Sequence, residues 1–307
     1  MIKIGIIGMN AGNGHPYSWS AIINGFFDGR EITEGGGYPG ITAYLEANKD
    51  TVGINEAQVT HVWTQERAAS ESVAKAAGID FIVDKMESMI GQVDAVILSR
   101  DDAENHVQMA KPFIDAGIPI FIDKPLAIHL NDLNYFREQQ ALGKLIMSCS
   151  SMRYSNECRV AKTELHQIGQ VELVTAVSTK GWPRYGIHML EALFMILEDP
   201  TPLTVTHVGS EKKDTVYIEF HNGIKATIHC FMDIAPTFQI SLFGQKSWRL
   251  IEIKNSYSMF RENIIEFIRS VQEGKSRLPF HKTANVIRTL IAGKESLEQG
   301  GKKIIIL

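Results

Sequence analysis

The sequence predicts a two-domain α/β chain: a doubly wound parallel sheet, followed by an α+β domain with a large, open, mainly antiparallel sheet. Three observations predict this. The 307 residues are enough for about two domains. Up to about residue 150, short apolar runs alternate with helical ones, which is typical of a parallel sheet buried on both faces. After that point polar and apolar residues alternate, as in antiparallel strands. We therefore expect domains at 1–150 and 151–307.

The elements of the first domain follow from local composition. Short apolar or β-branched runs predict strands at 2–7, 59–64, 93–98, 118–122 and 145–149. Helical spacing of apolar residues predicts helices at 18–27, 66–77, 104–116 and 130–142. Gly78 and Gly117 follow two of these helices, at the position where glycine commonly ends a helix. Strands joined by helices in this way build a doubly wound sheet.

An insertion of about thirty residues, 29–58, separates the first helix from the second strand, where a short connection is typical. It contains a glycine-rich stretch at 35–40 and a predicted helix at 41–48. Two interpretations stay open for this insertion: a lid over a binding site, or a decoration of the surface or of a dimer contact.

The second domain reads as alternating strands followed by two amphipathic helices. Strands are predicted at 171–178, 203–208, 214–220, 224–230, 238–243 and 247–253, and helices at 260–272 and 281–299. Asn222-Gly223 predicts a tight hairpin turn between two of the strands. The helices suffice for one face of the sheet only. We expect the other face, with Tyr217, Thr227 and Val174, to pair two copies in a homodimer or homotetramer.

Composition excludes several classes of partner. The 31 basic and 35 acidic residues give a formal net charge of −4, so we expect neither nucleic acid nor an anionic membrane as a partner. The three cysteines include no CxxC motif, and the N-terminus lacks the features of a signal peptide, so we expect a cytoplasmic protein with reduced thiols. The histidines are scattered, so no metal site is expected.

Three segments carry candidate chemistry. The turn Gly8–Gly14 follows the first strand and precedes a helix, as in sites that hold a pyrophosphate, although its spacing is not GxGxxG. Asp123-Lys124-Pro125 follows a buried strand, at the sheet edge where α/β proteins bind ligands. His188 and Glu191 are three residues apart at the start of an apolar helix and can share one face of it.

Together these segments resemble the Gfo/Idh/MocA (glucose–fructose oxidoreductase / inositol dehydrogenase) family nearly from end to end. The matching stretches are IKIGIIG at the N-terminus, the run from VDAVIL to DKPLA, MRY at 152–154 and GIH at 186–188, and DKPLA is similar to the family's EKPLA signature. The resemblance implies an N-terminal Rossmann domain that binds NAD or NADP and a C-terminal substrate-binding and oligomerisation domain. It also implies hydride transfer between nicotinamide and a sugar, polyol or sugar acid, with Lys124 and His188 as the catalytic pair.

Two departures from the family pattern affect the substrate and the cofactor. Many members carry Asp four residues before the histidine, and this chain has Arg184, which suggests an anionic sugar as one alternative substrate. The end of the second strand, where NAD enzymes usually carry an acid, has Thr64 followed by Gln65, Glu66 and Arg67. Arg67 suits the 2′-phosphate of NADP, and Glu66 equally suits the ribose of NAD. NAD and NADP therefore both stay open.

The expected site residues fall into two further sets. The expected cofactor contacts are Gly8, Asn10, Gly12, Gly14, Thr64, Gln65, Arg67, Ser99, Asp123 and Lys124. The expected contacts with a small-molecule substrate are His15, Tyr17, Arg153, Lys180, Trp182, Arg184 and Tyr185. The function predicted first is an NAD(P)-dependent dehydrogenase or reductase acting on CH–OH or C=O groups. The alternative is a dinucleotide-binding sensor of the same fold without turnover, which the Arg184 departure would favour.

Overall fold

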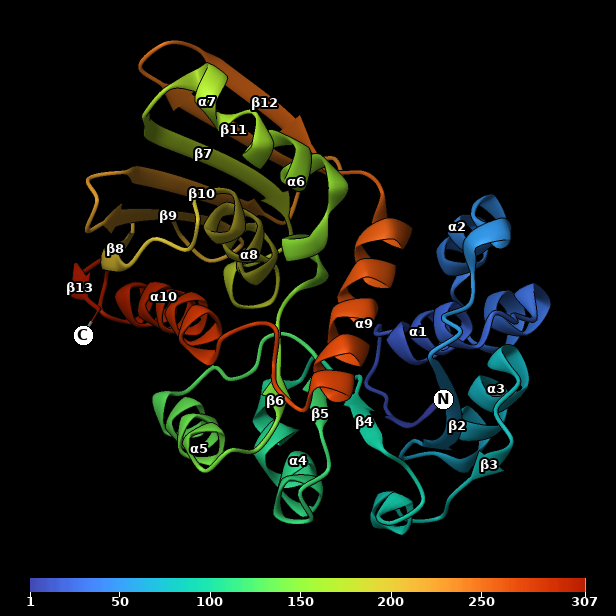
Figure 1. Ribbon diagram of the computed structural model, residues 1–307. Coiled ribbons are helices and arrows are strands. Elements are labelled where there is room, and N and C mark those ends of the chain that lie inside the picture. The colour runs from blue at the N-terminus through green and yellow to red at the C-terminus, as the bar shows by residue number, and fades with distance from the viewer. Residues whose placement is uncertain (307) are drawn as a thin grey trace. The chain divides into compact units, whose positions relative to one another are not determined.

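The computed structural model describes residues 1–306 and divides them into two compact units (Figure 1). The first unit contains residues 1–127, 134–148 and 260–280, and the second contains 128–133, 149–259 and 281–306. The chain thus leaves the first unit near residue 149 and returns to it for one late helical segment.

The first unit is built on a six-stranded, wholly parallel sheet in the order β3-β2-β1-β4-β5-β6. Its strands are β1 (Ile2–Ile7), β2 (Ala57–Trp63), β3 (Phe81–Ile82), β4 (Ala95–Leu98), β5 (Ile120–Ile122) and β6 (Ile146–Met147). Both faces of the sheet are buried, which is why the strands are apolar throughout rather than alternating. The predicted doubly wound fold is confirmed.

Several helices belong to this unit. They are α1 (His15–Asn24), α2 (Pro39–Ala47), α3 (Arg67–Ala77), α4 (His106–Asp115) and most of α5 (Leu130–Ala141), with the later part of α9 (Ser256–Glu273). α1 and α3 pack on each other and on β2, and α4 packs on β4 and β5 (Figure 1). The first helix begins three residues before its predicted start, because Pro16 suits the first turn of a helix. It ends at Gly25, which has a left-handed backbone.

The second unit is built on a seven-stranded sheet in the order β12-β11-β7-β10-β9-β8-β13. Its strands are β7 (Val171–Thr179), β8 (Pro202–His207), β9 (Lys213–Phe220), β10 (Lys225–Phe231), β11 (Phe238–Gly244), β12 (Trp248–Glu252) and β13 (Ile304–Ile305). The predicted hairpin turn at Asn222-Gly223 joins β9 to β10. The sheet is mixed: β7 pairs parallel with β10, and the other pairs are antiparallel.

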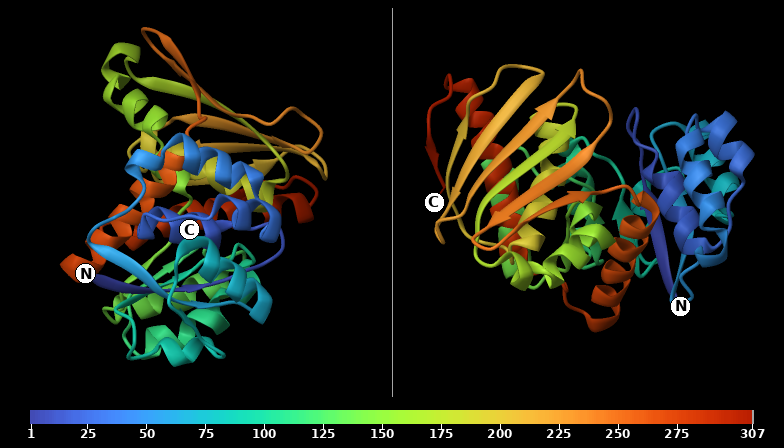
Figure 2. Two further views of the ribbon diagram at one scale, coloured as in Figure 1. Left: turned by 90° about the vertical axis from the view of Figure 1, so that its right-hand side faces the viewer. Right: turned by 90° about the horizontal axis from the view of Figure 1, so that it is seen from above.

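Helices cover one face of this sheet and leave the other open (Figure 2, right). The helices of the unit are α6 (Asn156–Thr163), α7 (Leu165–Ile168), α8 (Ile187–Ile196) and α10 (Phe280–Glu298). Tyr217 and Thr227 lie partly exposed on the open face, as predicted. The prediction for Val174 was wrong: it is fully buried, because its neighbour in the register is the equally buried Ala226. Within residues 1–306, no helix is both long and apolar enough to cross a membrane.

Candidate functional site

In the first unit, the candidate cofactor edge lies where the strand order reverses. β1 is bonded to β2 on one side and to β4 on the other, and in sheets of this kind ligands bind beside the carboxyl ends of the strands at that point. The buried Ser99 hydroxyl donates a hydrogen bond of 2.8 Å to the Ile7 carbonyl oxygen and joins these two strand ends. The segments that follow three strands of the sheet meet this edge: the turn Gly8–Gly14 after β1, Ser99 and Asp101 after β4, and Asp123 and Lys124 after β5. Of these, only Asp101 was not predicted as a site residue.

The glycine-rich turn is shaped by close approach of the insertion. A Cβ atom on Gly14 would lie 2.6 Å from the Ile41 Cδ1 atom and 2.9 Å from the Tyr38 Cδ1 atom, so only glycine fits there. Gly12 has φ +78°, a left-handed backbone that favours glycine, and no atom lies within 4 Å of where its Cβ would be. The insertion 29–58 therefore packs directly on the turn that precedes α1.

A buried carboxylate ties this turn to the lysine segment. Asp123 is 1% exposed and accepts hydrogen bonds from Asn13 Nδ2 at 3.0 Å and from its neighbour's backbone, Lys124 N, at 2.7 Å. His15 Nδ1 lies 2.5 Å from Asp123 Oδ2, the same oxygen that accepts from Asn13, while Lys124 N donates to Oδ1. Burial opposes ionisation of Asp123, but the charges and hydrogen bonds of His15, Lys124 and Asn13 outweigh it and lower the pKa of the carboxyl. Asp123 was predicted to contact the cofactor, whereas the structure uses it to hold two loops together.

Lys124 lies beside a second carboxylate. It is 6% exposed, and its Nζ atom donates a hydrogen bond of 3.2 Å to Asp101 Oδ2. Asn10, from the glycine-rich turn, holds Asp101 twice: its Nδ2 donates to Asp101 Oδ1 at 2.5 Å, and its Oδ1 accepts from Asp101 N at 3.1 Å. The ammonium group therefore lies at the sheet edge in a fixed position next to the turn.

The end of β2 offers no acid at the position expected for the ribose hydroxyls. Thr64 is buried, and its hydroxyl donates to the Glu66 carbonyl oxygen at 2.7 Å, so its side chain serves the local turn. Ser70 accepts a further hydrogen bond from Thr64 N at 2.8 Å. Gln65, the next residue, is exposed.

Arg67 is already paired with two acids. Its Nε atom lies 3.1 Å from Glu71 Oε1 and its Nη1 atom 2.9 Å from Asp84 Oδ1. A 2′-phosphate approaching this arginine would also meet both carboxylates, so the arrangement favours NAD over NADP.

His15 and Tyr17, two expected substrate contacts, are held inside the first unit. The His15 ring stacks on Trp19 with centroids 4.3 Å apart, and its Nδ1 atom is engaged by Asp123. Tyr17 is 2% exposed, and its hydroxyl donates to Ser72 Oγ at 2.9 Å. Tyr17 therefore packs α1 against α3 instead of facing a ligand.

In the second unit, His188 is the centre of the candidate site. It lies in the first turn of α8, and its Nδ1 atom is 2.6 Å from Ser150 Oγ. The rings of Tyr185 and Phe238 lie edge-on to it, with centroids 5.0 Å and 5.9 Å away. Lys180 Nζ donates to the Tyr185 hydroxyl at 2.7 Å, so three of the predicted residues lie together here.

A buried ion cluster lies one helical turn from His188. Arg153, 4% exposed, donates from Nε to Glu191 Oε2 at 2.5 Å and from Nη1 to Asp199 Oδ1 at 2.8 Å. Lys282 Nζ lies 2.8 Å from Asp199 Oδ2. Burial raises the pKa of the Glu191 carboxyl, and the Arg153 guanidinium works against that rise. Arg153 was expected to contact substrate. In the structure its guanidinium group donates hydrogen bonds to these two acids.

Two residues of the segment before α8 differ from expectation. Trp182 is 1% exposed, and its indole N–H donates to the Leu290 carbonyl oxygen at 3.0 Å, so it is a core residue and no substrate contact. Arg184 is exposed. Its position four residues before His188 is the observation that supports a role in substrate binding.

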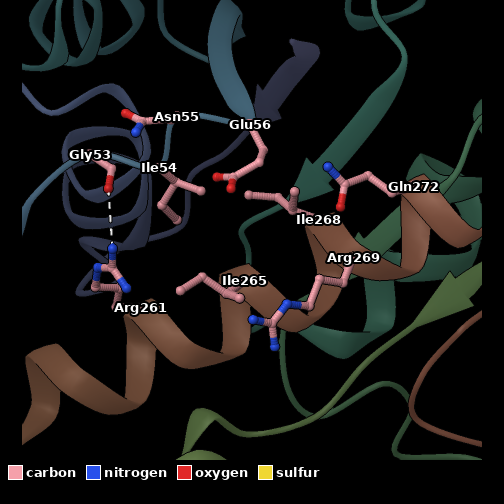
Figure 3. A pocket seen from close by; sticks show the side chains of 9 residues that line it. All are labelled: Gly53, Ile54, Asn55, Glu56, Arg261, Ile265, Ile268, Arg269 and Gln272. Carbon is pink, nitrogen blue, oxygen red and sulfur yellow. Dashed lines mark hydrogen bonds between the residues drawn. The ribbon is translucent and has the colours of Figure 1, made fainter.

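A separate polar cavity of about 240 Å³ lies at the other edge of the parallel sheet (Figure 3). It is lined by residues 53–56, which precede β2, and by one side of α9, where Arg261 donates to the Gly53 carbonyl oxygen at 3.3 Å. Ligands of such sheets bind at the carboxyl ends of the strands, and this cavity lies at an amino end. We therefore place the candidate site at Lys124 and not at this cavity.

Sequence reasoning missed Asp101 and Ser150, which contact Lys124 and His188. A usable signal existed for Asp101, because it follows a buried strand at the ligand-binding edge, as Lys124 does. Ser150 follows the last strand of the first sheet, and only the fold shows that it meets a histidine 38 positions away.

The strand order and the turn at the β1 end define an α/β protein of the dinucleotide-binding class. Residues 2–142 match the sequence model of the family described as "Oxidoreductase family, NAD-binding Rossmann fold", GFO_IDH_MocA. The resemblance to the Gfo/Idh/MocA oxidoreductase family seen in the sequence is confirmed over these residues.

Solved structures with the same fold cover essentially the whole chain. A myo-inositol 2-dehydrogenase from Lactobacillus plantarum aligns with TM-score 0.78 and 14% identity, over 100% of this chain and 99% of that one. Two other structures each align with TM-score 0.76 and 14% identity, over 100% of this chain and 99% of the other. They are a scyllo-inositol dehydrogenase from Lactobacillus casei with bound NAD(H) and scyllo-inositol, and a myo-inositol dehydrogenase from Corynebacterium glutamicum. No curated protein matches the chain.

We predict that Asp123→Ala destabilises the first unit strongly. The change leaves the buried Asn13 and the partly buried His15 without an acceptor, which costs about 3 kcal/mol of unfolding free energy or more. Asp84→Ala is the matched control, because Asp84 pairs with Arg67 while its side chain is 91% exposed. Its loss costs under about 0.5 kcal/mol. Calorimetry that found equal melting temperatures for both variants would contradict the anchoring role of Asp123.

Proposed function

We propose that the chain is an NAD-dependent dehydrogenase or reductase that exchanges a hydride between nicotinamide and a CH–OH or C=O group of a sugar-like polyol. The observation that carries this proposal is the placement of Lys124. It lies at the carboxyl edge of the parallel sheet, joined through Asp123 and Asn10–Asp101 to the glycine-rich turn. The family description adds an NAD-binding oxidoreductase, and the inositol dehydrogenases of the same fold support a polyol substrate.

The residues at this edge fit a dinucleotide. Gly12 leaves open space where a side chain would otherwise stand, which suits close approach of a pyrophosphate to the backbone, and Gly14 directly precedes the first turn of α1. Arg67 is neutralised by Glu71 and Asp84, so we assign NAD over NADP. Asn10 and Ser99 lie at the ends of β1 and β4, beside the expected place of the nicotinamide half.

The chemistry follows from what each side chain can do. Bound nicotinamide supplies the hydride acceptor or donor. Lys124 donates a hydrogen bond to the reacting oxygen, and Asp101 keeps its ammonium group oriented. His188 takes the hydroxyl proton when the alcohol is oxidised and returns it when the ketone is reduced. Tyr185 and Lys180 contact the substrate from the segment before His188.

Two further features of the proposal concern environment and assembly. The three cysteines, Cys149, Cys158 and Cys230, are buried free thiols, which fits a cytoplasmic protein.

The open face of the second sheet carries large exposed side chains that suit pairing with a second copy: Leu173, Phe243, Trp248 and Leu250.

The activity test is absorbance at 340 nm with NAD⁺ and a panel of inositols, aldoses and sugar acids. We expect turnover with at least one polyol, and Lys124→Ala to lower kcat by about 10²-fold or more with NAD binding nearly unchanged. Lys111→Ala, which removes an exposed lysine paired with Asp115, is the control and should behave as wild type.

Two results would count against this assignment. A Lys124→Ala variant that keeps more than about a tenth of the wild-type kcat would remove Lys124 from the chemistry. NAD binding without turnover on any member of the panel would instead indicate a dinucleotide sensor.

The role of Arg184 is tested by comparing acidic and neutral substrates. Arg184 is exposed and lies four residues before His188, in the segment that leads into the proposed substrate site. We expect Arg184→Ala to raise KM for a sugar acid about ten-fold and to leave the neutral analogue unaffected. Equal KM changes for both substrates would show that Arg184 plays no part in recognition.

Assembly is tested by light scattering. We expect a mass of two or four times the 34.2 kDa chain at micromolar concentration. Leu250→Asp places a charge on the open face and should shift the particle towards the single chain. Leu142→Asp, at a side chain that is 73% exposed in the first unit, serves as the control and should not. A wild-type particle of one chain would rule the assembly out.

A further inference from the structure

The insertion between α1 and β2 is fastened to the helices beside it. Glu31, at its start, accepts hydrogen bonds from Ser72 Oγ at 2.6 Å and from Lys75 Nζ at 2.7 Å, both on α3. Further along the insertion, the Tyr44 hydroxyl of α2 donates to Ser18 Oγ on α1. Contacts to two different helices hold the insertion in one place on the first unit.

Tyr38 brings this insertion to the glycine-rich turn. A Cβ atom on Gly14 would lie 2.9 Å from Tyr38 Cδ1, so the tyrosine ring packs directly on the glycine backbone. The ring also lies 5.6 Å, centroid to centroid, from the ring of Tyr17 on α1. The negative charge of Asp101, which follows β4, acts on the Tyr38 hydroxyl group. Tyr38 is therefore close to the segments after β1 and β4, where the strand order reverses.

The Tyr38 hydroxyl group is a donor that the protein itself does not use. Within residues 1–306 it makes no hydrogen bond, and the side chain is partly exposed. Partial burial, together with Tyr17 and Asp101, raises the pKa of the phenol, so the group keeps its hydrogen at neutral pH. It can therefore donate to a ligand that reaches this edge of the sheet.

The first turn of α1 is short of donors for an anion. An anion at a helix N-terminus is usually bound by the free backbone N–H groups of the first turn. Here the His15 N–H already donates to Asn13 Oδ1 at 2.9 Å, and Pro16 has no N–H. The turn at 8–14 also contains no lysine or arginine. A donor from outside the helix and the turn therefore strengthens the binding of a pyrophosphate here.

We propose that Tyr38 is a cofactor-binding residue supplied by the insertion, and that its hydroxyl group donates a hydrogen bond to the pyrophosphate of NAD. The insertion is then part of the cofactor site and not a decoration of the surface. The Asp101 carboxylate does not oppose this, because Lys124 and Asn10 already pair with it. The inference rests on the proposed NAD-dependent function, since it concerns the binding of that cofactor.

The test is calorimetric titration of Tyr38→Phe, which removes the hydroxyl group and keeps the ring on Gly14. We expect NAD to bind about ten-fold more weakly than to wild type, because a hydrogen bond to a charged group is lost. ADP-ribose, which has the pyrophosphate but no nicotinamide, should lose affinity by the same factor. The melting temperature should stay unchanged, because the hydroxyl group has no partner in the protein.

Tyr135→Phe is the matched control. It removes the hydroxyl group of another partly exposed tyrosine of the first unit, on α5. That hydroxyl group feels the charges of Lys111 and Asp115 near the end of α4, where the chain has left the ligand-binding edge. We expect Tyr135→Phe to bind NAD and ADP-ribose as wild type does.

The possible outcomes separate this inference from the proposed function. Wild-type affinity of Tyr38→Phe for ADP-ribose would overturn the inference, including the case in which only NAD binding is weakened. A wild-type protein that binds neither molecule would refute the NAD-dependent function and the role of Tyr38 with it. A ten-fold loss of affinity for both molecules in Tyr38→Phe would support the inference even if no substrate is turned over.

Discussion

The buried Asp123 carboxylate is the interaction on which the first unit's site depends. It accepts from Asn13 and His15 of the glycine-rich turn and from the backbone of Lys124, three partners that reach it from segments more than 100 positions apart. A fully buried, ionised carboxylate costs free energy unless hydrogen bonds replace the water it has lost. The folded state therefore requires the glycine-rich turn and the Lys124 segment to lie against Asp123. The turn and the lysine are therefore fixed relative to each other before any ligand binds.

The second unit also has buried acids whose ionic contacts fix the segment beside a candidate site residue. Glu191 and Asp199, both buried acids, share the guanidinium of Arg153, and through the Ser150 backbone this cluster sets the contact to His188. In both units buried ionic contacts fix the segment next to a residue proposed for the chemistry, Lys124 in the first unit and His188 in the second. Such preorganisation lowers the cost of orienting reacting groups at the moment of reaction.

The sequence predicted the elements well and their long-range partners poorly. Alternating short apolar strands and helices define the parallel sheet, and Lys124 follows from its place after a buried strand. The buried contacts of Arg153 and Trp182 were not predicted, because arginine and tryptophan occur in buried clusters as readily as at ligands, and only tertiary structure separates these uses. Ser150 was missed for the same reason. The mixed second sheet depends on β7 pairing with β10 across the intervening chain, which local alternation does not encode.

The central claim is that this chain moves a hydride between a carbinol carbon and NAD. The most direct measurement uses myo-inositol deuterated at every ring carbon, with NAD⁺ and the wild-type protein, and mass spectrometry of the reduced cofactor. The account predicts NADH that carries the deuterium, and unlabelled NADH from the unlabelled polyol. Reduced cofactor that lacked the label, with the same result for a second deuterated polyol that supports turnover, would contradict it.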